Sequence, residues 1–243
     1  MLLQLENVSK SFGALKVIND VSFDLEEGVA LGIMGPNGAG KTTLLNLIAG
    51  DLPLSSGDIF FDGTSLNGIS AEERCLSGIG RTSQIPRPFT GMTTYENVLV
   101  GAMYGSNLSE KEAEETCVNV LEQTGLLSRW NVEASQLRLL ERKRLELARA
   151  MATKPRLLLL DEIAGGLTDH EVQELLELIR EIRQQGITII WIEHIVHALV
   201  SVVDRIVAID FGNKLAEGTP EEVINSEAFK QVYFGVESVK LGA

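Results

Sequence analysis

The sequence has little cysteine, few aromatic residues and too few positive charges to balance its acids. Cys75 and Cys117 are the only cysteines in 243 residues and do not form a CxxC pair, so neither a disulfide framework nor a zinc site is expected. Lys and Arg number 21 against 34 Asp and Glu, a net charge of −13. This balance argues against nucleic acid as the main partner, because binding to its backbone needs clustered cations.

Long apolar runs are also missing. The longest, at residues 157–160 and 196–203, are much shorter than the roughly 20 residues that a membrane-spanning helix needs. Residues 1–7 lack the basic region and apolar core of a signal peptide. We therefore expect a cytoplasmic protein that associates with a membrane only through partners.

Short strand patterns alternate with helical patterns, which predicts an α/β fold with a mainly parallel core sheet. The opening differs, because residues 2–8 and 21–25 alternate like half-exposed strands and suggest an antiparallel β section first. Further strands are expected at 29–34, 58–61, 156–161, 187–192 and 205–209, and helices at 41–49 and 170–184. Residues 210–213 look like a hairpin turn, and residues 220–232 look like a helix.

Composition changes near Gln84. Pro86 and Pro88 prevent a regular helix directly after this residue. Three helical patterns follow at 94–103, 109–124 and about 140–152. We predict one domain over 1–243, in which a helical subdomain at about 86–152 is inserted between core segments 1–85 and 153–243.

A glycine-rich stretch at residues 35–43 carries the clearest chemical signal. It reads GPNGAGKTT and fits the pattern GxxxxGK followed by Ser or Thr. Because it joins a strand to a helix, main-chain N–H groups and the helix N-terminus would point at one anion. Lys41 would meet the β- and γ-phosphates, and Thr42 would offer its hydroxyl to Mg²⁺. The residues expected to hold nucleotide here are Asn37, Gly38, Ala39, Gly40, Lys41, Thr42 and Thr43.

Polar residues follow two of the expected buried strands. Asp161 and Glu162 come directly after four leucines, at the strand end where open α/β sheets bind ligands. Asp161 would hold Mg²⁺ through water, and Glu162 would act as general base on the attacking water. His194 follows the strand 187–192 and would contact the γ-phosphate and orient the water, although a histidine in such a place is as often structural.

These motifs, in this order, resemble the ATP-binding-cassette family over nearly the whole chain. The resemblance implies a P-loop NTPase fold of the cassette type, with ATP and Mg²⁺ as cofactors. It places Gln84 where a glutamine reaches Mg²⁺ and the water, so the implied metal site is Thr42, Gln84 and Asp161. It makes His194 the switch histidine and puts Phe12 under the adenine, with Val17 beside it.

Finer detail resembles the ATPases of branched-chain amino-acid importers. The stretches that carry this likeness are GRTSQIPRPF (80–89), ENVLVG (96–101) and RLELARA (144–150). The resemblance implies a peripheral ATPase on the inner face of the cell membrane that works with transmembrane permeases. An exporter ATPase for lipid or polysaccharide, a soluble non-transport cassette and a binding subunit without turnover remain alternatives.

This sequence departs from the family pattern in the segment that would face a partner subunit. In this family two cassettes form each active site, and the signature LSGGQ of one faces the phosphate loop of the other. With the family's usual spacing before Asp161, the resemblance places the signature at Leu137, Arg138, Leu139, Leu140 and Glu141. The usual serine is Arg138, and leucine side chains replace two glycines that permit close approach. Pairing with a different cassette would therefore give one regular and one weak site, whereas pairing with itself would give two altered ones.

Overall fold

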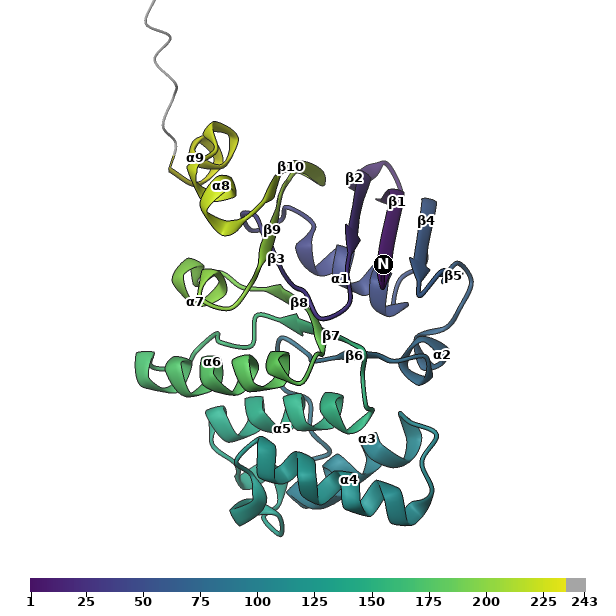
Figure 1. Ribbon diagram of the computed structural model, residues 1–243, viewed down its shortest axis with the longest axis vertical. Coiled ribbons are helices and arrows are strands. Elements are labelled where there is room, and N and C mark those ends of the chain that lie inside the picture. Colours follow the sequence, from purple (N-terminus) through teal and green to yellow (C-terminus); the bar gives the residue numbers. More distant parts are fainter. Residues whose placement is uncertain (235–243) are drawn as a thin grey trace, which may run out of the picture.

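The computed structural model describes residues 1–234. The last nine residues of the predicted domain 1–243 lie outside the described range. Two sheets and several helical layers make up the molecule, with the helices of residues 94–152 gathered at one end (Figure 1).

Within residues 1–234, six strands form the larger sheet, in the order β10-β9-β3-β8-β7-β6. Their bounds are β3 Ala30–Met34, β6 Ile79–Arg81, β7 Leu157–Asp161, β8 Thr188–Ile192, β9 Arg205–Asp210 and β10 Asn213–Gly218. All neighbours pair in parallel except β9 and β10, which form an antiparallel hairpin. The predicted mainly parallel sheet and the turn at 210–213 are confirmed. The short strand β6 escaped prediction because three residues carry no periodicity.

The smaller sheet is antiparallel and has the order β2-β1-β4-β5 in the described part of the chain. Its strands are β1 Leu3–Phe12, β2 Leu15–Leu25, β4 Ser56–Phe61 and β5 Thr64–Ser65. The predicted N-terminal antiparallel section is confirmed. Its strands extend beyond the predicted bounds, because shifts in pairing between β1 and β2 interrupt the simple alternation of side chains.

Strand β7 shows why the core forms as it does. It lies between β8 and β6, and all of its five residues are buried. Leu158 and Leu160 enter one hydrophobic core, whereas Leu157 and Leu159 enter the other. Successive side chains of a strand point to opposite faces, so a run of leucines requires cover on both sides of the sheet.

The two faces have different cover. On one face lie the helix α1, Lys41–Ala49, and the smaller sheet. On the other lie α5, Leu139–Ala152, and α6, Asp169–Gln184. The helix α6 presents Val172, Leu175, Leu176, Ile179 and Ile182 to this core, at the spacing of one helical face.

The remaining helices are short or belong to the helical end. They are α2 Ala71–Leu76, α3 Thr94–Tyr104, α4 Glu110–Gln123, α7 Val196–Val200, α8 Pro220–Asn225 and α9 Glu227–Phe234, with 3-10 turns at Leu127–Arg129 and Ala134–Gln136. Helices α3, α4 and α5 form a layer at the bottom of the view in Figure 1. Capping boxes begin α3 and α4, where Glu96 and Glu112 accept hydrogen bonds from the N–H groups of Thr93 and Ser109, the residues just before each helix.

The predicted helical stretch at 220–232 is confirmed, but it consists of two helices and not one. Ser226 has φ −63° and ψ 143°, which is extended backbone, and it separates α8 from α9. Its hydroxyl accepts a hydrogen bond from the N–H of Phe229 at 3.3 Å. A serine that bonds a nearby main-chain N–H offers the chain an alternative to continued helix.

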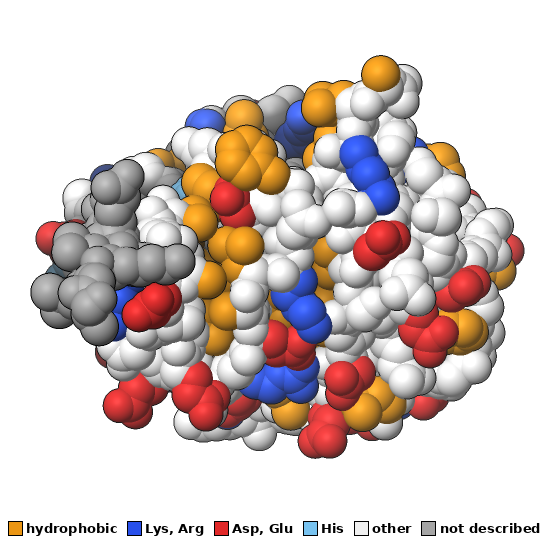
Figure 2. Space-filling model, turned by 90° about the horizontal axis from the view of Figure 1, so that it is seen from above, with side chains coloured by type: hydrophobic (Ala, Val, Ile, Leu, Met, Phe, Trp, Pro, Cys, Tyr) orange, Lys and Arg blue, Asp and Glu red, His pale blue; other side chains and the backbone are white. Residues whose placement is uncertain are grey.

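No helix in residues 1–234 is long and apolar enough to cross a membrane. Acidic side chains are spread over the rim of the face shown in Figure 2, and basic ones form small groups between them. This distribution matches the net charge of −13.

Candidate nucleotide site

The phosphate loop joins β3 to α1. Gly38 and Gly40 have φ of +83° and +102°, the left-handed region that favours glycine. A Cβ on Gly40 would lie 2.7 Å from the carbonyl oxygen of Val17. The glycines thus permit both the curl of the loop and its close approach to β2.

Lys41 is buried in the same loop, with 5% of its surface exposed. Its ammonium donates hydrogen bonds to the carbonyl oxygens of Gly35 at 2.7 Å and Pro36 at 3.1 Å. Burial lowers the pKa of the Lys41 ammonium, and the carboxylates of Glu162 and Asp161 act in the opposite direction. The cation is therefore held against the loop, with acidic groups opposite.

The loop's geometry predicts the result of adding one methyl group. A Cβ on Gly35 would collide with the carbonyl oxygen of Ile209, so Gly35→Ala must displace the loop or β9. We expect the free energy of unfolding to fall by about 1–3 kcal/mol, and we expect the affinity for Mg·ATP to fall as well.

The control is Gly63→Ala, where φ is +75° and nothing lies within 4 Å of the added Cβ. It should lose about 1 kcal/mol and keep its affinity. Denaturant unfolding measures the change in stability and nucleotide titration measures the affinity. Unchanged affinity in Gly35→Ala would contradict the proposed phosphate-binding role of the loop.

Two cavities meet at Thr42. The first, of about 220 Å³, is lined by Val17, Asn37, Gly38, Gly40, Lys41, Thr42, Thr43 and Glu162. The second, of about 540 Å³, is lined by Thr42, Asn46, Asp51, Arg81, Ser83, Gln84, Ile85, Arg87 and Asp161. The predicted phosphate-binding residues other than Ala39 line the first cavity, and the predicted metal ligands line the second. Ala39 lies within the same loop and is buried.

Asp161 ends β7 and is almost fully buried, at 1% exposure. The hydroxyl of Thr42 lies 3.5 Å from its carboxylate, and the guanidinium of Arg81 lies 3.7 Å away. Burial raises the pKa of the Asp161 carboxyl, and the charge of Arg81 opposes that rise. A hydroxyl beside a carboxylate is an oxygen donor set that suits Mg²⁺, which keeps several waters. No group of three or more His, Cys, Asp or Glu placed for a metal occurs among residues 1–234.

Gln84, Glu162 and His194 come together although they are distant in sequence. The amide of Gln84 donates to one carboxylate oxygen of Glu162, and His194 Nε2 lies 2.5 Å from the other. Glu162 has φ +46°, an uncommon conformation for a residue with a side chain. Its N–H bonds the carbonyl of Ile192 on β8 at 2.8 Å. The Glu162 carboxylate is thus directed into the cavity of the phosphate loop.

Sequence reasoning missed three charged residues beside this group. Arg81 contacts Asp161, Lys143 donates to the main chain of Gln84 and Glu162, and Glu193 accepts from the N–H of His194. Glu193 had a usable signal, since an acid follows the buried strand β8 directly. Lys143 had none, because its helix reads as an ordinary charged helix.

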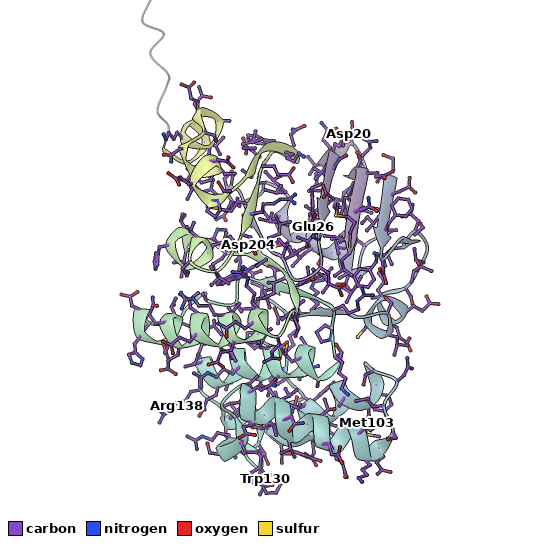
Figure 3. All side chains as sticks on the ribbon, viewed as in Figure 1. Asp20, Glu26, Met103, Trp130, Arg138 and Asp204 are labelled. Atoms are coloured by element: carbon purple, nitrogen blue, oxygen red, sulfur yellow. The ribbon has the colours of Figure 1, made fainter. Side chains whose placement is uncertain are left out.

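Other predicted residues lie apart from these cavities. Phe12 ends β1, is 47% exposed and has the Lys10 ammonium 5.1 Å above its ring. Arg138 precedes α5 and points outward at the side of the helical layer (Figure 3). Its N–H bonds the carboxylate of Glu141 at 2.9 Å, and Arg129 contacts the same carboxylate at 2.9 Å. Leu137 is buried, whereas Leu139 is 42% exposed and Leu140 is half-buried. Neither cavity includes any residue of 137–141.

The strand, glycine-rich loop, helix and opposed acidic strand end define a P-loop nucleotide-binding domain. The sequence profile of the ABC transporter family matches residues 18–165. The chain belongs to this family, and it is an ATP-hydrolysing cassette.

Three relatives show the range of the likeness. The high-affinity branched-chain amino acid transport ATP-binding protein LivG of Salmonella typhimurium is 36% identical, over 96% of this chain and 98% of that protein. The lipopolysaccharide export system ATP-binding protein LptB of Haemophilus influenzae is 32% identical, over 96% and 97%. The solved ADP form of MJ1267, an ATP-binding cassette of an ABC transporter, has a TM-score of 0.86 at 29% identity, covering 97% of this chain and 99% of its own.

Proposed function

We propose that this chain is the ATPase subunit of an importer for branched-chain and related hydrophobic amino acids. The observation that carries the ATPase half is the contact of Gln84 and His194 with the two carboxylate oxygens of Glu162. The substrate half rests on near full-length similarity to the branched-chain amino acid protein LivG.

The residues divide the reaction between binding and water activation. Main-chain N–H groups of the loop and the Lys41 ammonium bind the triphosphate. Thr42 and Asp161 would hold Mg²⁺, which when bound neutralises charge on the phosphate oxygens. Glu162 would accept a proton from the attacking water, while Gln84 and His194 orient that water and the carboxylate. Phe12 and Val17 would contact the adenine from β1 and β2.

The partner we propose is a second cassette with a regular signature. Arg138, Leu139 and Leu140 would face the partner's phosphate loop, and two leucine side chains there keep main chain from approaching a phosphate. This chain's own loop would meet the partner's signature instead. The mixed pair would then have one competent site and one weak site.

Membrane association would occur through permeases, on the inner face of the cell membrane. A groove of about 420 Å³ between the core and the helical end is lined by residues of α2, β6, α3 and α5. Phe89 stands near it with 43% exposure, and the Arg149 guanidinium lies 4.8 Å from its ring. An exposed aromatic residue on a proline-restricted loop suits a docking surface, and Pro86 and Pro88 restrict this loop.

The alternative with specific support is export, because LptB is also similar over nearly the full chain. The test is reconstitution of this chain with its permeases, second cassette and substrate-binding protein in liposomes. We expect ATP-dependent uptake of labelled leucine. Hydrolysis without leucine uptake, accompanied by release of lipid to an acceptor, would favour export and refute the proposal.

A further inference from the structure

Lys143 is a buried cation that the proposed reaction does not use. It lies in the first half of α5 and has 5% of its surface exposed. Its ammonium donates to the carbonyl oxygen of Gln84 at 3.0 Å and points to that of Glu162 at 3.4 Å. One side chain of the helical end therefore contacts the main chain at two of the residues that act on the water.

The main chain at Glu162 needs such support. A residue with a side chain in the left-handed region stores about 1–2 kcal/mol of strain, and such conformations persist only where neighbouring groups fix them. Glu162 is held from the sheet by the carbonyl of Ile192. Its carbonyl oxygen accepts from the Lys143 ammonium at 3.4 Å and from the N–H of Gly165 at 3.3 Å.

Burial lowers the pKa of the Lys143 ammonium, and the carboxylates of Glu193, Glu162, Glu146 and Asp161 act in the opposite direction. Glu193 is itself buried, at 3% exposure, and accepts from the N–H groups of Ala164 at 3.1 Å and His194 at 2.9 Å. Glu193 therefore joins the main chain of the loop after β7 to that of the loop after β8, which carries His194.

We propose that Lys143 is a positioning residue for ATP hydrolysis, which fixes Gln84 and Glu162 relative to each other and to α5. The inference rests on the proposed roles of these two residues. Because the ammonium is carried by α5, a movement of the helical end changes the spacing of Gln84 and Glu162 directly. Docking of a permease at that end would then alter the rate of hydrolysis without altering the phosphate loop.

The test is Lys143→Met in the assembled transporter, with Lys143→Arg as the conservative variant. We expect Lys143→Met to lower kcat by roughly 100-fold, the loss typical of a displacement of about 1 Å in a catalytic group. The KM and the dissociation constant for Mg·ATP should stay within about threefold, because the phosphate loop is unchanged. Lys143→Arg keeps the positive charge and the N–H donors, so it should retain most of the kcat of the unmodified protein.

A matched control separates positioning from folding. Arg74 is also buried, at 4% exposure, and donates to the main-chain carbonyls of Leu47, Ile48 and Leu66 away from Glu162. Arg74→Met should lower Tm and keep kcat per folded molecule within about twofold. The proposal is overturned if Lys143→Met keeps its kcat, or if its losses follow Tm as those of Arg74→Met do.

If Lys143→Met does not fold, Lys143→Gln supplies the measurement instead. Lys143→Gln keeps an N–H donor but removes the charge, and a kcat loss above about tenfold at constant nucleotide affinity supports positioning. An unchanged kcat in Lys143→Gln would overturn it. A transporter that hydrolyses ATP but does not move leucine refutes the proposed substrate alone, because the Lys143 test measures hydrolysis.

Discussion

Replacing Lys41 by Ala lowers the affinity for Mg·ATP by at least ~100-fold, the equivalent of about 3 kcal/mol for a buried charge-assisted contact. The ammonium is buried in the loop and held by the carbonyl oxygens of Gly35 and Pro36. It supplies the positive charge to the lining of the 220 Å³ cavity, so alanine leaves the phosphates with uncharged donors there. Titration with a fluorescent ATP analogue in the presence of Mg²⁺ measures the loss.

Lys214→Ala is the matched control for this experiment. The Lys214 ammonium also bonds a main-chain carbonyl, that of Ser22 at 2.6 Å, together with the carboxylate of Glu217. It lies on β10 and lines neither of the two cavities that meet at Thr42. Its removal should leave affinity within about twofold, as expected for a surface ion pair. Equal affinity in Lys41→Ala and Lys214→Ala would remove the basis for the proposed phosphate site.

The main sheet was predictable because each of its central strands is buried on both faces. The run of leucines before Asp161 is compatible only with cover on both sides, and it fixed the strand end from which Asp161 projects. The glycine-rich loop was predictable for a similar reason. Its residue types match a backbone path with left-handed φ at Gly38 and Gly40.

Short elements and long-range contacts were not predictable in the same way. Helix α7 and strand β6 have five and three residues, fewer than a reliable periodic pattern needs. The contact of Gln84 and His194 with Glu162 depends on how β6, β7 and β8 lie next to one another in the sheet. No local sequence pattern encodes that arrangement. Lys143 acquires its place from the packing of α5 against the same strand ends, so only the structure reveals it.

Glu162→Gln is expected to abolish most hydrolysis while preserving nucleotide binding. The amide keeps the shape and one acceptor of the side chain but loses the charge that accepts a proton from water. Loss of a general base typically lowers the rate by roughly 10²–10⁴-fold. Glu177→Gln on the exposed face of α6 makes the same chemical change away from the site and should keep full activity. Phosphate release at saturating Mg·ATP measures the difference, and an active Glu162→Gln would show that another group activates the water.

The same substitution tests the asymmetry of the proposed pair. In a complex with a cassette that has a regular signature, Glu162 belongs to the site completed by that signature. The partner's equivalent carboxylate belongs to the site facing Arg138, Leu139 and Leu140, where Glu141 already binds the N–H of Arg138. Glu162→Gln should therefore remove nearly all turnover, and the matching change in the partner should remove only a small part. Equal losses from the two changes would contradict the asymmetry, since they would show that the altered signature supports hydrolysis as well as a regular one.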